Sequence, residues 1–566
     1  MASIEPAAIL AAMERELARS LEGLRVPDVP APYYLAYALR REEQLLLRGA
    51  YGALARNRHA LRHRVFVDVR VGDEGFDNVY DGGLNVDATD RESADWLEAA
   101  DELDPEVLRV AFWKLSEIKF DEAVEDYYDH QKASVSEFLR DEVEAFSRAP
   151  RVEHLEALDE RPLDREAWGR LVARASERFL RHPEIFDASV ELNLRRVHRF
   201  FVDSGGTRVL TSDLFLDLQV QGWVLTEDGV YVEASRSIYG RSLDRIPSAE
   251  ALDALVGEVL GDLHELQSAP SPGSFIGPAL LAGQAAATIF HEALGHRLEG
   301  ERLVARGETR TFAHKVGERI LPAGLDVYDD PTLERIGEQD LWGSYRIDDQ
   351  GVEAQRVELV KDGVLRSFLQ SRSPTPHADR SNGHGRHDGV EPIMARMGNL
   401  IVEASSEGKT WQALMDELCA LARSQGRKHG VLIRHVRAGE TSTSSYDFQV
   451  FKGELAEVYL VDAQTQALTR VRDVELIGTP LAAMQRIVSH GEDVGLDYGS
   501  CFAESGAVPV GGASPPLLLS EVELQQSSSS GFHEPLLPPP FADDGSRGRE
   551  GGRASRGRRR APEEGA

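Results

Sequence analysis

The chain has 566 residues, 42% of them hydrophobic, so it is long enough to form two or three domains with buried cores. Its formal net charge of -31 argues against a nucleic-acid-binding surface over most of the protein, because phosphate backbones attract the opposite charge. Two cysteines cannot provide a framework of disulfides, and they indicate a reducing compartment.

The N-terminal segment predicts a helix and no targeting signal. Apolar residues recur at helical spacing from Ile4 to Leu21, with charged residues between them, so the apolar core of a signal peptide is missing. A stretch of about twenty apolar residues, as a membrane span requires, does not occur in the sequence. We therefore expect a cytoplasmic protein.

Residues 1–270 are predicted to form a mixed α/β region. Strands are expected at 33–39, 64–71, 188–192, 197–202, 208–210 and 214–225. A charged and mostly helical segment is expected near 93–181, and a further helix over 249–266. The run of serine, proline and glycine at 268–273 then predicts a domain boundary, because these residues interrupt regular structure.

Residues 271–525 are predicted to form a β-rich, predominantly antiparallel domain. Its strands are expected at 352–360, 364–369, 430–436, 445–451, 455–461 and 468–476. The residues 361–363, Lys-Asp-Gly, are typical of a hairpin turn, and one helix is expected over 410–423. The sequence as a whole therefore predicts an α+β fold.

The C-terminal tail, residues 526–566, is rich in Ser, Gly, Pro and Arg. It cannot bury enough apolar surface to offset its ordering entropy, so we expect it to be disordered. Its arginine-rich end is either a solubilising segment or a contact for nucleic acid or an acidic partner.

A candidate metal site lies in the stretch that ends at His296. Its alanines favour a slim helix that begins near Pro278 and runs into His291 and Glu292, and this helix opens the C-terminal domain. The pattern His-Glu-x-x-x-His supplies two candidate ligands and a candidate general base for hydrolysis at zinc. Histidines five residues apart point roughly 140° from each other on an α-helix. We therefore expect the helix to end at Gly295 or to widen there into a π-type turn.

Short motifs surround this pattern. They are Gly283-Gln284-Ala285-Ala286-Ala287 before it and, after it, Glu299, Asp348-Asp349-Gln350-Gly351, Asn382-Gly383-His384-Gly385-Arg386, Arg396-Met397-Gly398-Asn399 and Gly499-Ser500-Cys501. Together they resemble the TldD/PmbA metallopeptidase family over most of the second half of the chain. On the histidine pattern alone, a charged helix end that faces solvent is an equal alternative.

The resemblance implies a zinc-dependent peptidase. Catalytically competent members have a third zinc ligand, a cysteine far downstream, and Cys501 matches that position. Zn²⁺ is thus the expected cofactor, held by His291, His296 and Cys501, with Glu292 as the catalytic base for metal-activated water. The resemblance also implies a peptide or unfolded polypeptide as substrate, and a homodimer or a heterodimer with a related family member. The alternatives are a non-catalytic modulator or scaffold subunit, and a purely structural metal.

Several details remain open at this level. Related sequences typically follow the cysteine with Gly and Lys, whereas here residues 502–506 read Phe-Ala-Glu-Ser-Gly, so a changed loop could alter substrate access. Glu299 either orients a ligand histidine or faces solvent. A glycine-rich loop could place donors against a substrate carbonyl, or it is an exposed turn. Its candidate substrate-binding residues are Asn382, Gly383, His384, Gly385 and Arg386. His377 and His387 are expected at the surface, and Cys419 in the core.

Overall fold

The computed structural model describes residues 5–79, 96–136, 143–226, 228–305, 307–405, 407–444, 450–527 and Pro540. It combines helices with extensive antiparallel sheets, which confirms the predicted α+β class. Of the tail expected from residue 526 onward, only Gln526, Ser527 and Pro540 are among the described residues. None of the described helices has the length and apolar character needed to cross a membrane.

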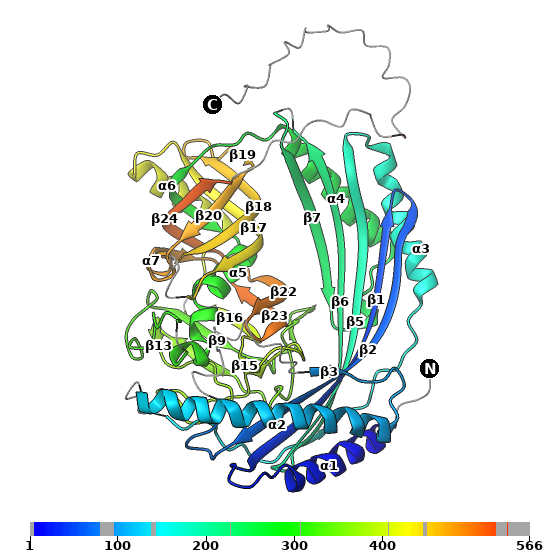
Figure 1. The fold of residues 1–566 in the computed structure, drawn as a ribbon. Coiled ribbons are helices and arrows are strands. Elements are labelled where there is room, and N and C mark those ends of the chain that lie inside the picture. The colour runs from blue at the N-terminus through cyan, green and yellow to red at the C-terminus, as the bar shows by residue number, and fades with distance from the viewer. Residues whose placement is uncertain are drawn as a thin grey trace, which may run out of the picture.

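A curved sheet of long strands forms the N-terminal part of the protein (Figure 1). Its strand order is β3-β2-β1-β5-β6-β4, with β7 paired to β6. The strands are β1 (Pro32–Ala50), β2 (Ala53–Val71), β3 (Trp96–Glu98), β4 (Glu153–Leu155), β5 (Ile185–Asp203), β6 (Arg208–Leu225) and β7 (Tyr231–Gly240). The two strands predicted at 188–192 and 197–202 are one, because pairing with β1 and β6 continues through the residues between them.

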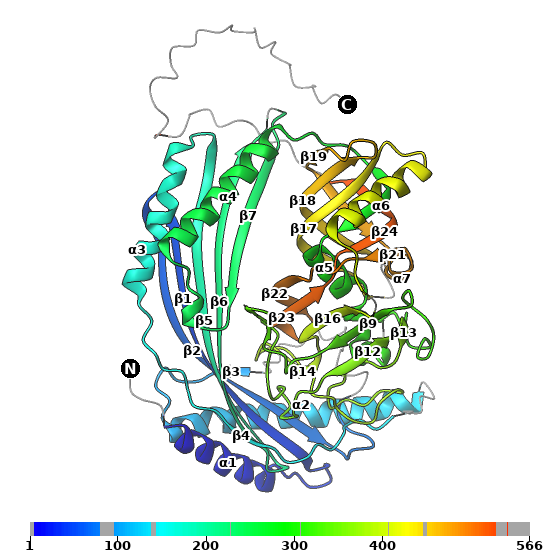
Figure 2. The ribbon, with the colours of Figure 1, turned by 180° about the vertical axis from the view of Figure 1, so that it is seen from behind.

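Four α-helices pack against one face of this sheet. They are α1 (Pro6–Gly23), α2 (Pro105–Ser136), α3 (Arg165–Ser176) and α4 (Ala249–Ser268). Alternate residues of β1 contact them: Leu35 and Tyr37 lie in the core with α1 and α2, and Leu45 and Leu47 lie in the core with α3 and α4. Figure 2 shows α4 against β6 and β7. Short 3-10 helices follow α3 and β7, η3 (Glu177–Arg181) and η4 (Leu243–Arg245).

The C-terminal part contains two larger sheets. One has the order β13-β12-β9-β16-β23-β22, and its strands are β9 (Leu325–Asp329), β12 (Val357–Lys361), β13 (Val364–Leu365), β16 (Asn399–Ala404), β22 (Gly495–Ala503) and β23 (Gly506–Ser514). The other has the order β17-β8-β24-β20-β18-β19, with β21 paired to β24, and its strands are β8 (Phe275–Leu281), β17 (His429–Thr441), β18 (Phe451–Asp462), β19 (Leu468–Val471), β20 (Val474–Gly478), β21 (Ile487–His490) and β24 (Leu517–Gln526). Only the pairs β16–β23 and β8–β17 are parallel among these described strands.

Smaller elements complete this part of the chain. They are the two-stranded ladders β10 (Arg335–Ile336) with β11 (Gln339–Asp340) and β14 (Gly385–Arg386) with β15 (Met394–Ala395), the helices α5 (Gly283–Ala293), α6 (Trp411–Ser424) and α7 (Pro480–Gln485), and the 3-10 helices η5 (Gly295–Leu298) and η6 (Gly300–Leu303). Helix α6 matches the helix predicted at 410–423, and Cys419 is buried in it as expected. The predicted hairpin between β12 and β13 forms, with positive φ angles at Asp362 and Gly363. Of the strand predicted at 445–451, residues 445–449 lie outside the described residues.

The start of the central helix was wrong in the sequence prediction. Pro278 does not begin a helix: it lies in strand β8, and α5 begins only at Gly283. Proline is tolerated in this strand because the pairing of β8 with β24 is irregular there, with a register shift between Leu519 and Val522. The apolar residues 279–281 are thus in a buried strand that delivers the chain into α5.

Candidate metal centre

Helix α5 carries the first part of the candidate site, and its end turns the chain back. All of its residues except Gln284 and His291 are buried, and it ends at Ala293. The 3-10 helix η5 begins at Gly295, so the predicted change of helical path occurs, although its form is 3-10 and not π. A Cβ atom at Gly295 would lie 2.1 Å from Met397 Sδ, so only glycine permits this close packing. As a result, the rings of His291 and His296 lie 4.9 Å apart between centroids, with an interplanar angle of 88°.

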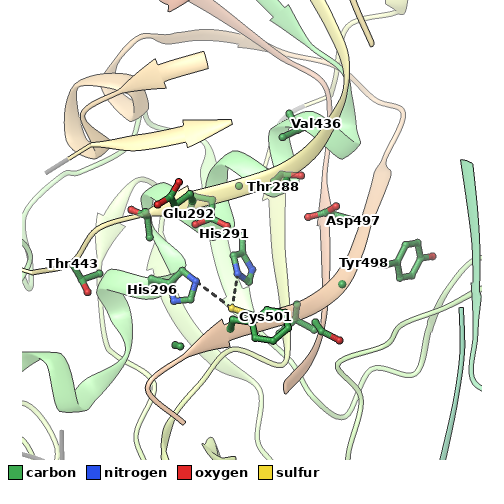
Figure 3. A pocket seen from close by; sticks show the side chains of 18 of the residues that line it. Thr288, His291, Glu292, His296, Val436, Thr443, Asp497, Tyr498 and Cys501 are labelled. Carbon is green, nitrogen blue, oxygen red and sulfur yellow. Dashed lines mark hydrogen bonds between the residues drawn. The ribbon is translucent and has the colours of Figure 1, made fainter. Parts of the chain in front are cut away.

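Cys501 lies beside both imidazoles, although it is 205 residues from the nearer one in sequence (Figure 3). Its Sγ atom is 3.1 Å from His291 Nε2 and 3.2 Å from His296 Nε2. Cys501 is on strand β22, which pairs with β23, and it is buried. The segment 502–506 is accordingly the end of β22, a tight turn and the start of β23.

The donor atoms of these three residues suit a zinc ion. Cys501 Sγ lies 3.1 and 3.2 Å from the two Nε2 atoms, and zinc–nitrogen and zinc–sulfur bonds of about 2.0 and 2.3 Å place tetrahedral ligands a little over 3 Å apart. Burial opposes ionisation of Cys501, but the two histidines and Arg396 hold the pKa of the thiol well below its usual range. Burial likewise opposes protonation of His296, yet Cys501 and Glu299 raise its pKa to about 10. The cluster therefore favours a thiolate at Cys501 beside a protonated His296, and a divalent cation can replace such a proton.

Glu299 holds His296 in its orientation. It is fully buried, so the alternative in which it faces solvent is wrong. Its carboxylate lies 3.2 Å from His296 Nδ1, which directs the opposite ring nitrogen, Nε2, toward Cys501. Burial raises the pKa of Glu299, but His296 and Arg302 outweigh it and lower the pKa to about 2, so the group is a carboxylate at neutral pH.

Two arginines that the residue-by-residue reasoning missed connect these groups. Arg396 is fully buried; its Nε lies 3.2 Å from Glu299 Oε1, and its Nη2 donates to the Cys501 carbonyl oxygen at 2.8 Å. Arg302 donates from Nε to Glu299 and from Nη2 to Glu504 Oε2, at 2.8 and 2.7 Å. The motif that contains Arg396 was noticed as a family resemblance, but no local pattern shows that its guanidinium reaches the cysteine strand.

A pocket of about 540 Å³ opens over the cluster, between two strand edges. One is β22, the last strand of its sheet, whose residues 497–503 line the pocket. The other is β17, which pairs with β8 only as far as Ile433. Residues 437–441 of β17 line the pocket, and no described strand pairs with them on this edge. Glu292 is buried and lines the same pocket, close to Gly439. Figure 3 shows Glu292 and His291 on the side of β17, and Cys501 on the strand opposite.

The glycine-rich loop at 382–386 does not reach this pocket. Among the described residues that line the pocket, none comes from this loop. His384 is buried, with Nε2 3.1 Å from Asp329 Oδ1, and Arg386 donates to the Pro509 carbonyl oxygen at 2.8 Å. Because these side chains make internal contacts, the predicted contact with substrate by Asn382, Gly383, His384, Gly385 and Arg386 is not supported by the geometry. His377 is exposed as expected, but the surface prediction for His387 was wrong, since it is buried against Phe66.

Comparison with known proteins finds similarity to metallopeptidases. Residues 274–526 match the PmbA/TldA metallopeptidase C-terminal domain. The chain is 30% identical to a "Metalloprotease" of Archaeoglobus fulgidus over 49% of its own length and 62% of that protein. It is 30% identical to a "Metalloprotease TldD homolog" of Haemophilus influenzae over 46% of its own length and 50% of that protein. It is 22% identical to a "Zinc metalloprotease TldD homolog" of Saccharolobus solfataricus, over 61% and 72%. The match to the first two relatives thus spans between one half and two thirds of their length.

The overall fold is shared with solved structures. A protein of Thermotoga maritima described as a modulator of a DNA gyrase superposes with a TM-score of 0.60 at 15% identity, over 91% of this chain and 99% of that one. TldE from Thermococcus kodakarensis gives 0.57 at 15% identity, over 91% and 100%. The second half of the chain is therefore a metallopeptidase-type C-terminal domain within this fold. Residues 274–526 thus belong to the TldD/PmbA family.

Proposed function

We propose that the protein is a zinc-dependent peptidase whose metal ligands are His291, His296 and Cys501. The observation that carries this proposal is the convergence of two imidazoles and a thiol from α5, η5 and β22 beneath an open pocket. Three protein ligands leave a fourth position for water or substrate, as in catalytic zinc sites, whereas structural sites normally have four protein ligands. The names of the metalloprotease relatives support the same class of reaction.

Glu292 is the proposed catalytic base. It lies one residue before the end of α5, and it lines the pocket together with His291, the residue before it in sequence. When bound, zinc supplies a Lewis acid that acidifies water and polarises a peptide carbonyl. Glu292 accepts the proton of the attacking water and returns it to the amine that leaves when the C–N bond breaks.

The proposed substrate is an extended peptide or an unfolded polypeptide. Two strand edges that no other described strand pairs with, residues 437–441 of β17 and 497–503 of β22, line opposite sides of the pocket. An extended chain can pair its backbone with such edges, largely independently of its sequence. Folded proteins do not expose backbone in this way, so this geometry favours peptides and unfolded segments.

We further propose that the protein works in a reducing cytoplasm and as a dimer. Both cysteines are free, and Cys501 has to remain a thiolate for its proposed role. The likeness to TldE supports pairing with a second chain of this fold, identical or related. A non-catalytic modulator is the alternative function, and the neighbour described as a gyrase modulator favours it at the level of the fold alone.

Replacement of Glu292 by glutamine tests the catalytic proposal. Glu292→Gln keeps the size of the side chain but removes its basicity, so zinc content should stay at the wild-type level while peptide turnover falls roughly a hundred- to ten-thousand-fold. Turnover is measured by mass spectrometry on a defined peptide mixture, and zinc by elemental analysis. The control is Glu358→Gln, a carboxylate on β12 whose side chain is 51% exposed and does not line the pocket, and it should leave turnover near wild type. Full activity of Glu292→Gln would rule out the base, and wild-type protein without zinc or turnover would favour the modulator.

A further inference from the structure

A second group of potential ligands lies in the N-terminal part of the protein. His182, Glu184 and His264 present one donor atom each, and these atoms all lie within 4.8 Å of one another. The Oε1 atom of Glu184 is 3.2 Å from His182 Nδ1 and 2.8 Å from His264 Nε2. None of these residues lines the pocket over Cys501.

The three residues come from two structural elements that meet at one end of the long sheet. His182 is the C-terminal cap of η3, and Glu184 directly precedes β5. His264 is on α4, which packs against the same sheet and lies 80 residues further along the chain. The histidine rings lie 5.4 Å apart between centroids, with the carboxylate oxygen between their nitrogens.

The chemistry of this group matches a metal site and not an ordinary salt bridge. Two imidazoles and one carboxylate form a ligand set that zinc uses in proteins. Among the ion pairs of the described residues, Glu184 pairs with these two histidines and with no lysine or arginine. The three side chains are 27%, 31% and 47% exposed, so an ion can reach them from solvent without any rearrangement of the core.

The oxygen–nitrogen distances are already close to those between ligands of one ion. Zinc bonds of about 2.0–2.2 Å to nitrogen and oxygen place tetrahedral ligands a little over 3 Å apart. The two contacts of Glu184 fall near this value, so rotations of exposed side chains are sufficient to complete the site. Water would occupy the remaining position.

We propose that His182, Glu184 and His264 form a second zinc site, separate from the pocket over Cys501. An ion held there connects α4 to the turn between η3 and β5. Since α4 covers β6 and β7, the bound ion stabilises the packing of that helix on the sheet. The ion thus acts on the stability of this part of the fold, and its ligands lie outside the pocket of the proposed catalysis.

The experiment measures Zn²⁺ binding in a full-length chain whose first site has been removed. In the His296→Ala/Cys501→Ser variant, equilibrium dialysis of chelator-treated protein against Zn²⁺ should give one zinc per chain. Adding His264→Ala should weaken this binding at least about tenfold, and Glu184→Gln should do the same, because each removes a ligand. Zinc should also raise the thermal midpoint of the double variant, and this rise should disappear with His264→Ala.

A similar pair elsewhere in the same part of the protein provides the control. His154 Nε2 lies 2.8 Å from Glu156 Oε1, with side-chain exposures of 31% and 33%, and no third potential ligand joins this pair among the clusters found in the described residues. His154→Ala should therefore leave zinc binding unchanged.

Two results would overturn the proposal. One is a double variant that binds no zinc at micromolar concentrations. The other is zinc binding that survives His264→Ala and Glu184→Gln with the same affinity. Both outcomes are independent of peptidase activity, so they leave the proposed function untouched. Circular dichroism verifies that each variant is folded.

Discussion

At the scale of single residues, one missing side chain makes room for the proposed base. Gly439 lies directly against Glu292 in the wall of the pocket, and a Cβ atom at this position would lie 2.4 Å from Glu292 Cγ and 2.6 Å from its Oε1. Atoms cannot approach so closely, so Gly439→Ala should displace the carboxylate. We expect peptide turnover to fall at least about tenfold while zinc binding is unchanged, because the three proposed metal ligands lie on other elements.

The residue opposite Gly439 in the β17–β18 ladder is the matched control. Gly453 is its direct partner in the register, and a Cβ atom there would meet Val436 at 3.5 Å, an ordinary contact. Gly453→Ala should therefore keep turnover close to wild type. If Gly439→Ala is as active as Gly453→Ala, the observed position of the Glu292 carboxylate is not required for peptide turnover.

At the scale of elements, the end of the helix that carries the histidine pattern could be predicted from the sequence, whereas its start could not. The end of α5 was predicted correctly from Gly295, because a glycine interrupts a helix through its local backbone conformation. Its start was misjudged because Pro278 resembles a helix start locally, while the long-range pairing of β8 with β24 and β17 makes it a strand.

The position of Cys501 shows the same limit. Its glycine and serine neighbours suggest a loop, yet they form an edge strand whose pairing with β23 depends on the fold. The contacts of Arg396 and the burial of His387 likewise arise from tertiary packing that local sequence does not encode. Residue chemistry near the histidines was therefore predictable, whereas the support around it required the assembled sheets.

The inner strands of the long sheet contain a carboxyl group with unusual titration. Asp217 of β6 lies opposite Asn193 of β5, and burial, together with Glu191, raises its pKa from 3.8 to about 6 against the opposing effect of Arg195. The folded state thus binds this proton more tightly than the unfolded state does. The resulting contribution to stability is complete below pH 3.8 and is lost as the pH rises through about 6.

Asp217→Asn should remove this dependence, because asparagine stays neutral. We expect a higher thermal midpoint than wild type at about pH 8, and a difference that disappears as the pH falls to about 4. Differential scanning fluorimetry across this range provides the measurement. Asp187→Asn, on β5 with a side chain 55% exposed, serves as the control and should follow the wild-type curve. An Asp217→Asn curve parallel to wild type would contradict the assignment.

At the scale of the whole molecule, an arginine joins the N-terminal sheet to the C-terminal part. Arg199 of β5 donates from Nη1 to the Asp348 carbonyl oxygen and from Nη2 to the Ile347 carbonyl oxygen, each at 2.6 Å, and it also pairs with the Asp349 carboxylate. The ion pair is mostly buried, with side-chain exposures of 11% and 15%. Burial raises the pKa of Asp349, but Arg199 and His387 outweigh it, so the pKa stays below its usual value. The Asp348–Gly351 motif, noticed first as a family resemblance, thus serves to dock the two parts of the chain.

Arg199→Ala should destabilise the protein by about 3 kcal/mol, because it leaves a buried carboxylate and two carbonyl groups without their donor. Arg199→Lys should recover part of this loss, since it keeps the charge but cannot form the three contacts together. Denaturant unfolding measures the free energy of unfolding. The control Arg148→Ala, which removes an ion pair whose arginine side chain is 84% exposed, should change this free energy by less than about 1 kcal/mol.

Limited proteolysis then tests which region of the protein is destabilised by Arg199→Ala: new cleavage between the two parts would show that Arg199 holds them together. Equal stability of Arg199→Ala and Arg148→Ala would mean that the two parts stay docked through other contacts.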